Sequence, residues 1–197
     1  MMELRLMTEP EIARWYADEL SEAFPPNERK PLDEILALRA QGRYEIQGLF
    51  DGGALLGYAA LWMEPRDTTY ILLDYLGVTA ARRNGGLGGR LLGRVVAAYF
   101  GRSRVLLEAE QPVPGGEEGE NDLRRRRIAF YERSGFAPLY DMATCGMRFL
   151  ALIGGEAPRD LAPVMAAHRA VYGPARTDVK VPLAPGQVPE QPHWMKG

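Results

Sequence analysis

The sequence has little cysteine, histidine and lysine, and each shortage excludes a class of site. Its only cysteine, Cys145, excludes an intrachain disulfide and a metal site made of cysteines alone. His168 and His193 are too few and too far apart for a histidine-based metal site, so we predict no metal. No lysine lies between Lys30 and Lys180, and no stretch matches the Walker A loop of nucleotide-binding proteins.

Long apolar runs and a strong charge of either sign are also missing. No apolar run approaches the ~20 residues that a membrane helix needs. The first residues, "MMELRLMTEPE", lack the basic and apolar regions of a signal peptide. The net charge of −2 provides no general attraction to nucleic acid or to a membrane. We therefore expect a cytoplasmic protein without a nucleic-acid or membrane partner.

Strand and helix patterns alternate along the chain. A hydrophobic fraction of 46% in 197 residues fits one domain with an appendage. We expect an α/β domain with a mixed sheet at 1–155, and a C-terminal helix with a Pro-rich tail at 156–197, partly disordered or packed on the domain. The predicted strands are 2–7, 44–50, 54–63, 68–78, 104–110, 137–144 and 147–154, and the predicted helices are 11–24, 31–42, 123–135, 159–173 and one from the glycines to about 100.

The stretch "VTAARRNGGLGGRLLGRVV" places four glycines directly before a predicted helix. Glycine weakens a helix by roughly 1 kcal/mol relative to alanine. The first N–H groups of a helix lack partners and carry a positive dipole, and glycine lets a large anion approach them. Six arginines and no acidic residue lie between Thr79 and Arg104. We therefore predict a phosphate-binding loop at 84–89; a Gly-rich turn before a solvated basic helix is the structural alternative.

A dinucleotide-binding loop is a second interpretation of the same glycines. Gly86 and Gly88 supply two glycines of Gly-x-Gly-x-x-Gly, but Leu91 occupies the third position. Glu108 follows Gly88 by twenty residues, where a ribose-binding acid belongs. Six residues, "TAARRN", separate the preceding strand from the glycines, which argues against this fold. A dinucleotide-dependent oxidoreductase remains the less favoured alternative.

Two motifs resemble those of the GNAT superfamily of N-acyltransferases. Residues 83–88, "RNGGLG", match its acyl-CoA-binding pattern Arg-x-x-Gly-x-Gly, and "RRIAFYERSGFAPL" resembles its later helix-to-strand segment. The resemblance extends to about Ile153; Arg124 and Arg127 depart from it, where an asparagine and a small residue are usual. It implies a GNAT-like, mostly antiparallel sheet flanked by helices and splayed at the acyl-CoA-binding strand.

The resemblance also implies a function and a set of site residues. The expected activity is transfer of an acetyl group from acetyl-CoA to a primary amine, which attacks the thioester directly. Tyr131 would be the general acid, because a phenol is protonated at pH 7. The N–H of Val78 would polarise the thioester carbonyl. The residues implied to bind the coenzyme are Leu76, Gly77, Val78, Arg83, Asn84, Gly85, Gly86, Leu87, Gly88, Gly89 and Tyr131.

Several carboxylates are candidates for the general base. Glu108 comes first, because ribosomal-protein alanine acetyltransferases of the family carry "LEV" where this chain has "LEA". Asp74 comes second: if its strand alternates regularly, it shares a face with Leu72 and Leu76. Glu110 is third, and a chain of water molecules remains open.

The acceptor is an amine on a small molecule or a peptide. The resemblance places its site beside two segments, one around 19–34, which is fairly acidic, and one at 140–147. A non-catalytic acyl-CoA-binding domain of the same fold is the main alternative function. Dimers are common in the family, which leaves a homodimer open.

Overall fold

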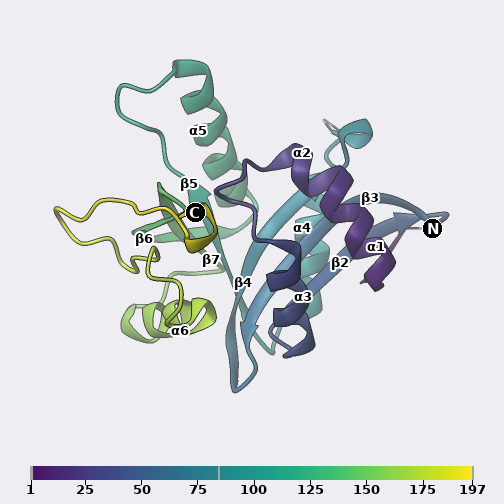
Figure 1. The fold of residues 1–197 in the computed structure, drawn as a ribbon, viewed down its shortest axis with the longest axis horizontal. Helices are drawn as coiled ribbons and strands as arrows, with labels where there is room; N and C mark the ends of the chain where they lie inside the picture. Colours follow the sequence, from purple (N-terminus) through teal and green to yellow (C-terminus); the bar gives the residue numbers. More distant parts are fainter. Residues whose placement is uncertain (1, 84, 197) are drawn as a thin grey trace.

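A twisted sheet forms the centre of the molecule (Figure 1). The computed structural model describes residues 2–83 and 85–196, and within them seven strands follow the order β1-β2-β3-β4-β5-β7-β6. All neighbouring strands are antiparallel except β4 and β5. This confirms the mixed, mostly antiparallel sheet, and the parallel sheet of a dinucleotide-binding fold is wrong for this chain. The strands are β1 Glu3–Leu6, β2 Tyr44–Asp51, β3 Ala54–Glu64, β4 Asp67–Val78, β5 Arg104–Glu110, β6 Phe136–Thr144 and β7 Met147–Gly154.

Helices cover both faces of this sheet. One core cluster includes apolar residues of α1, α3 and α6, such as Ile12, Ile35 and Val164. The other includes Leu91 and Val95 of α4, with α5 packed at its border. The helices are α1 Glu9–Trp15, α2 Ser21–Ala23, α3 Leu32–Ala40, α4 Leu87–Tyr99, α5 Glu118–Arg133 and α6 Ala162–Tyr172, with a π-helical turn at Tyr16–Leu20 and 3₁₀ turns at Ala80–Arg82 and His193–Met195.

Two helix boundaries differ from the prediction for local reasons. Helix α5 begins at Glu118, five residues before the predicted start, because the Glu117 carboxylate accepts hydrogen bonds from the N–H groups of Gly119 and Glu120. Part of the predicted loop at 112–122 is therefore helical. Helix α6 begins at Ala162, which places Pro163 in the first turn, where no intrahelical N–H bond is lost.

Strands β4 and β5 separate halfway along their length. Their pairing runs from Tyr70 opposite Arg104 to Leu73 opposite Leu107 and stops there. At the same point the register of β4 with β3 shifts, so that Asp74 is an extra, bulged residue. The sheet is therefore splayed from Asp74 to Val78, as expected.

The bulge also corrects the predicted alternation of β4. Leu72 and Tyr75 both belong to the first core cluster, whereas Leu76 packs against the second. Asp74 bonds Tyr44 and Lys30 on the side of the first cluster. Asp74 therefore shares a face with Leu72 but not with Leu76, because a bulge breaks the two-residue period of a strand.

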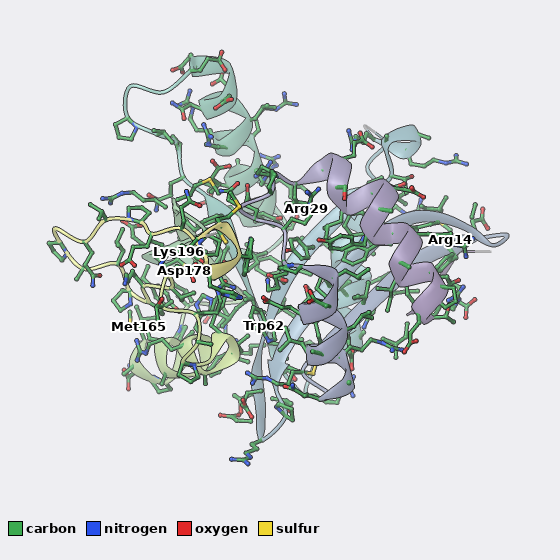
Figure 2. All side chains as sticks on the ribbon, viewed as in Figure 1. Arg14, Arg29, Trp62, Met165, Asp178 and Lys196 are labelled. Atoms are coloured by element: carbon green, nitrogen blue, oxygen red, sulfur yellow. The ribbon has the colours of Figure 1, made fainter. Side chains whose placement is uncertain are left out.

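The chain after α6 returns toward the middle of the molecule, where Asp178 and Lys196 lie (Figure 2). Ala143 of β6 and Lys180 exchange two backbone hydrogen bonds of 3.1 and 2.8 Å. The Trp194 indole donates to the carbonyl of Pro26 at 3.2 Å. The C-terminal segment thus contacts both β6 and the loop between α2 and α3, while the domain boundary at residue 155 stays a prediction.

Glycine is required at Gly77 and only tolerated at Gly93. A Cβ at Gly77 would lie 2.2 Å from Cζ of the buried Tyr58 ring, whereas a Cβ at Gly93 in α4 meets nothing within 4 Å. We expect Gly77→Ala to lower the free energy of unfolding by about 1–3 kcal/mol through overpacking. Gly93→Ala should raise it by roughly 0.5–1 kcal/mol, because alanine favours the helix. Urea denaturation of both variants measures the difference, and equal effects would contradict the packing at Tyr58.

Candidate active site

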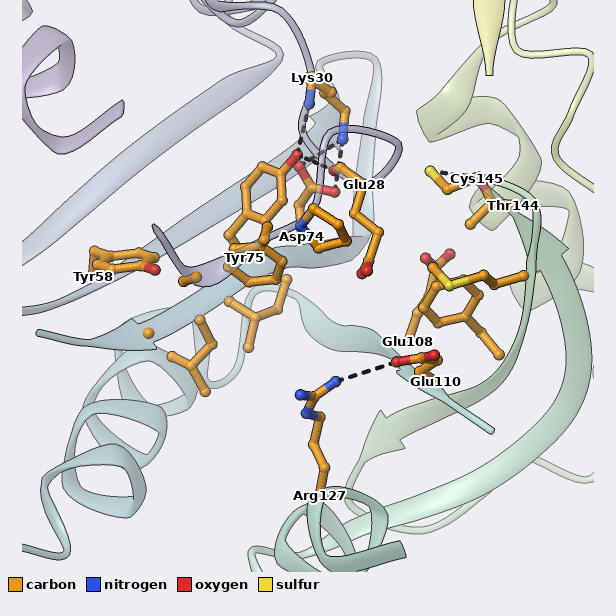
Figure 3. A pocket seen from close by; sticks show the side chains of 18 of the residues that line it. Glu28, Lys30, Tyr58, Asp74, Tyr75, Glu108, Glu110, Arg127, Thr144 and Cys145 are labelled. Atoms are coloured by element: carbon orange, nitrogen blue, oxygen red, sulfur yellow. Dashed lines mark hydrogen bonds and ion pairs between the residues drawn. The ribbon is translucent and has the colours of Figure 1, made fainter. Parts of the chain in front are cut away.

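A cleft of about 600 Å³ lies where β4 and β5 separate. In Figure 3, Lys30 and Tyr75 lie on one side of this cleft. Glu108, Glu110 and Cys145 lie on the opposite side. Its walls come from β4, β5, α5, the loop before α3, the β6–β7 turn and the C-terminal segment. Lining residues include Glu28, Lys30, Asp74, Tyr75, Leu76, Gly77, Val78, Arg83, Glu108, Glu110, Arg124, Arg127, Tyr131, Thr144, Cys145, Tyr172 and Arg176.

The exposed edge of β4 forms one wall of the cleft. Leu76, Gly77 and Val78 pair with β3 on one side, and no described strand pairs with them on the other. Backbone N–H and C=O groups on such an edge can bind an extended ligand as an added strand would. All three residues line the cleft, as the coenzyme assignment requires.

The N-terminus of α4 lies beside the end of this edge. Gly86 has φ of +70° as the residue before the helix, so its backbone conformation requires glycine. A Cβ at Gly88 would only touch Val78 and Phe130, at 3.8 and 4.0 Å, and one at Gly89 would touch Phe130 at 3.8 Å. Packing therefore does not explain the glycines at these two positions, which leave the first turn of the helix bare for a ligand.

The other residues of the predicted phosphate-binding loop differ in their surroundings. Leu87 begins α4 and packs against the second core cluster. Arg83 lines the cleft and pairs with Glu22 at 3.3 Å in an exposed ion pair. Gly85 is exposed beside Gly86. Asn84 lies outside the described residues.

Tyr131 lies on α5 with its side chain partly buried against the second core cluster. Its ring packs against Phe130 and Phe136, with centroids 5.2 and 6.2 Å apart, and it lines the cleft. Its hydroxyl bonds none of the residues that the structure describes. Burial raises the pKa of Tyr131, so the phenol stays protonated at neutral pH and can donate to a ligand.

The three carboxylates proposed as the base are all engaged. Glu108 lies 2.8 Å from Nε2 of His168 and accepts the Tyr172 hydroxyl at 2.7 Å. Asp74 binds Nζ of Lys30 at 2.8 Å and also accepts the Tyr44 hydroxyl. Glu110 accepts a 2.7 Å hydrogen bond from Nε of Arg124. Each of these carboxylates thus already has a hydrogen-bond donor before any ligand binds.

Glu28, on the loop before α3, differs from these three carboxylates. Its side chain points into the cleft toward Glu108 and Glu110 (Figure 3), and it makes no hydrogen bond or ion pair with any described residue. Burial, with a smaller contribution from the charge of Glu110, raises the pKa of Glu28 to about 7. A carboxyl group with this pKa and no partner suits proton abstraction near neutral pH.

The backbone around Glu28 is held by Tyr75. The Tyr75 hydroxyl donates to the Glu28 carbonyl at 2.7 Å and accepts from the backbone N–H of Lys30 at 3.0 Å. The sequence did not single out Glu28, which it presents only as part of an acidic segment. It also missed Tyr172 and Arg176, because the segment that carries them reaches the cleft only through the fold.

The described residues contain neither a metal-binding cluster nor a membrane-spanning helix. No group of three or more histidine, cysteine, aspartate or glutamate side chains among residues 2–83 and 85–196 is arranged to hold a metal ion. Over the same residues, no helix is both long and apolar enough to cross a membrane.

Residues 10–136 match the sequence model of the acetyltransferase (GNAT) family. The match covers more than half of the chain and includes the α4 loop, β4, β5 and Tyr131. The chain therefore belongs to the GNAT family of acetyltransferases. No curated protein sequence matches the chain closely enough to add a particular activity.

Solved structures of acetyltransferases share the fold at low sequence identity. A protein from Bacteroides thetaiotaomicron described as a GNAT-family acetyltransferase has a TM-score of 0.64 and 23% identity, over 84% of this chain and 94% of that one. The ribosomal-protein-S18-alanine N-acetyltransferase of Escherichia coli has a TM-score of 0.59 and 17% identity, over 82% and 99%. Spermidine N-acetyltransferase of Vibrio cholerae, solved with CoA and spermine, has a TM-score of 0.57 and 12% identity, over 77% and 94%.

The raised pKa of Glu28 predicts a pH-dependent effect on stability. The pKa of Glu28 is about 7 in the folded protein and 4.5 in the unfolded chain. Between these two pH values the folded state keeps the proton and the unfolded chain loses it. The free energy of unfolding therefore falls as the pH rises from 4.5 to about 7. We expect Glu28→Gln to raise the free energy of unfolding by about 2 kcal/mol at pH 8 and to change it little at pH 4. Urea denaturation at both pH values measures this. A gain of the same size at both would contradict an ionised, unpaired Glu28.

Proposed function

We propose that this protein is an N-acetyltransferase that moves an acetyl group from acetyl-CoA to a primary amine. The observation that carries the proposal is the unpaired edge of β4, which runs from the bare first turn of α4 into a cleft containing Tyr131 and Glu28. The edge offers hydrogen bonds to an extended chain, the helix terminus suits phosphate, and the two side chains suit proton transfer. Membership of the GNAT family supports the same reaction.

The residues present fit coenzyme A. Gly86, Gly88 and Gly89 leave the N–H groups of α4 open to a pyrophosphate, and Arg83 adds positive charge nearby. The backbone of Leu76 and Val78 would bind the pantetheine amides along the free edge of β4. When bound, acetyl-CoA supplies the thioester that an amine attacks directly.

Glu28 and Tyr131 divide the proton transfers between them. Glu28 removes a proton from the attacking amine. Its carboxyl group has no partner, and near neutral pH it is ionised in about half of the molecules. Tyr131 donates a proton to the departing thiolate, because its raised pKa keeps the phenol protonated. The N–H of Val78 stabilises the negative charge that develops on the carbonyl oxygen. Glu108 is the alternative base, with His168 and Tyr172 behind it.

A small amine is the acceptor that the cleft supports best. The carboxyl groups of Glu28 and Glu108 line the part of the cleft beyond Tyr131, which favours an ammonium group. The related structures belong to enzymes named for an alanine of a ribosomal protein and for spermidine, both amine acceptors. We also propose a cytoplasmic location, because the reaction consumes acetyl-CoA, an intracellular metabolite.

Coenzyme binding provides the first test. Gly88 and Gly93 both lie on α4, and a Cβ fits at each, but only Gly88 lies in the first turn. We expect isothermal titration to show acetyl-CoA binding to the wild type and to Gly93→Glu. Gly88→Glu should lose at least tenfold in affinity, because its carboxylate repels the pyrophosphate. Failure of the wild type to bind would contradict the proposed function, and equal losses in both variants would contradict the glycine-loop site.

The pH dependence of turnover tests the two catalytic roles. We expect kcat/KM to rise with pH through about 7 in the wild type, as Glu28 loses its proton. Glu28→Gln should lower kcat/KM about a hundredfold or more and remove this limb. Tyr131→Phe should lower kcat by a similar factor, keep the limb and leave acetyl-CoA affinity unchanged.

Each alternative role gives a different result in the same measurements. If the limb near pH 7 survives in Glu28→Gln and disappears in Glu108→Gln, then Glu108 is the base. A wild type that binds acetyl-CoA but transfers the acetyl group to no amine would favour a non-catalytic acyl-CoA-binding domain. Unchanged turnover in Tyr131→Phe would exclude the phenol as the acid.

A further inference from the structure

Arg176 lies in the cleft wall and belongs to the segment that follows α6. Its side chain is almost fully buried, with 7% of the residue exposed. Nε and Nη2 donate to the two carboxylate oxygens of Asp178, each at 2.9 Å, and Nη2 also donates to Oγ1 of Thr144 at 2.8 Å. The guanidinium is therefore fixed in one orientation.

One side of this guanidinium remains without a partner. A guanidinium has five N–H donors, and the bonds to Asp178 and Thr144 use those on Nε and Nη2. Nη1 donates to none of the residues that the structure describes. Although the residue is buried, the Nη1 atom itself is open to solvent, so a ligand that enters the cleft can accept hydrogen bonds from its two N–H groups. The structure thus presents a fixed pair of donors to whatever occupies the cleft.

Aromatic rings hold the guanidinium in place. The ring of Tyr172 lies 5.0 Å from Cζ of Arg176, and the ring of Trp194 lies 4.8 Å from it. Trp194 is itself bonded to the loop that carries Glu28, through the carbonyl of Pro26. The C-terminal segment therefore holds Arg176 in a fixed place relative to that loop, which a cation needed only for solubility would not require.

The local charge balance disfavours a dianion as the ligand of Arg176. Asp178 already neutralises the guanidinium; although burial opposes its ionisation, the bonds from Arg176 hold the pKa of Asp178 at about 2. A phosphate dianion would meet repulsion from Asp178 and from the cleft carboxylates. A carboxylate carries less charge and can accept both hydrogens of Nη1.

We propose that Arg176 binds a carboxylate on the acceptor, so that the acceptor is a small amine that also carries a carboxylate, such as an amino acid. This inference rests on the proposed function, because it assigns the acceptor of the same cleft. The amine of such a molecule meets Glu28, while its carboxylate meets the free side of Arg176. The C-terminal segment is then a specificity element rather than only a covering of the domain.

Matched pairs of acceptors test the inference directly. Each pair is an amino acid and its amide: glycine, L-alanine, β-alanine and 4-aminobutyrate, with spermidine as a control without a carboxylate. Thiol release from acetyl-CoA gives kcat and KM for each. We expect the wild type to prefer the acid over the amide in at least one pair by about tenfold or more, mainly through KM.

Two variants separate recognition from structure. Arg176→Lys keeps the charge beside Asp178 but loses the fork of donors, and it should reduce the acid-to-amide ratio by about tenfold. The double variant Arg176→Gln/Asp178→Asn removes both charges, leaves no buried ion unpaired and should abolish the ratio. Arg169→Lys on α6 is the matched control, since Arg169 bonds the Val181 carbonyl and does not line the cleft. Acetyl-CoA titration checks that each variant folds.

The outcomes distinguish this inference from the proposed function. A wild type that acetylates the amides or spermidine as well as the acids overturns the carboxylate site and leaves the acetyltransferase standing. The same conclusion follows if the acid is preferred equally in wild type and Arg176→Lys, or if acetyl-CoA binds and no amino acid reacts. If acetyl-CoA neither binds nor is consumed, the proposed function fails and this inference fails with it.

Discussion

The bulge at Asp74 is the constraint on which the rest of the site depends. It ends the pairing of β4 with β5, and it places Asp74 and Tyr75 on the same side of the sheet. Asp74 then binds the side chain of Lys30, while Tyr75 bonds both the Lys30 N–H and the Glu28 carbonyl. One irregular residue thus opens the edge of β4 and also fixes the loop that carries Glu28.

The Lys30–Asp74 pair explains how a bulge survives in the middle of a sheet. Both side chains are less than 10% exposed, and Nζ of Lys30 also lies 4.5 Å from the centre of the Trp62 ring. A buried pair of this kind adds little stability compared with apolar residues, but it tolerates few other arrangements. Its contribution is therefore positional: the pair joins the loop that carries Glu28 to β4 at the bulge. Asp74 thus helps to set the geometry of the cleft, and its role as a general base stays a prediction.

The features that could be predicted from the sequence are those encoded in short motifs. The features that could not be predicted depend on contacts between distant parts of the chain. The glycines at 85–89 and the segment around Tyr131 are short motifs, so the family and the splayed sheet followed from them, and both are confirmed. The faces of Tyr75 and Leu76 could not, because alternation assumes a regular strand and a bulge has no reliable sequence signal. Glu28 lies in "PPNERK", a stretch whose composition is typical of a solvated loop. In the structure, a hydrogen bond from Tyr75 to the Glu28 carbonyl holds this loop beside the cleft. Arg176 sits between a helix and a proline-rich tail whose approach to the cleft depends on distant contacts with β6 and Pro26.

The pairing of charges around the cleft separates its carboxylates into two kinds. Glu108, Asp74 and Glu110 each have donors nearby: His168 for Glu108, Lys30 for Asp74 and Arg124 for Glu110. Glu28 has no donor, and the charge of Glu110 adds to burial in raising its pKa. Arg124 and Arg127 limit that rise, because their positive charges favour the ionised form of Glu28. The pKa near 7 is thus a balance between burial, one carboxylate and two arginines on α5. In proteins that carry an asparagine and a small residue at those two positions, a buried carboxyl in the place of Glu28 would lack this opposing charge. The arginines that depart from the family pattern therefore keep Glu28 ionisable at neutral pH.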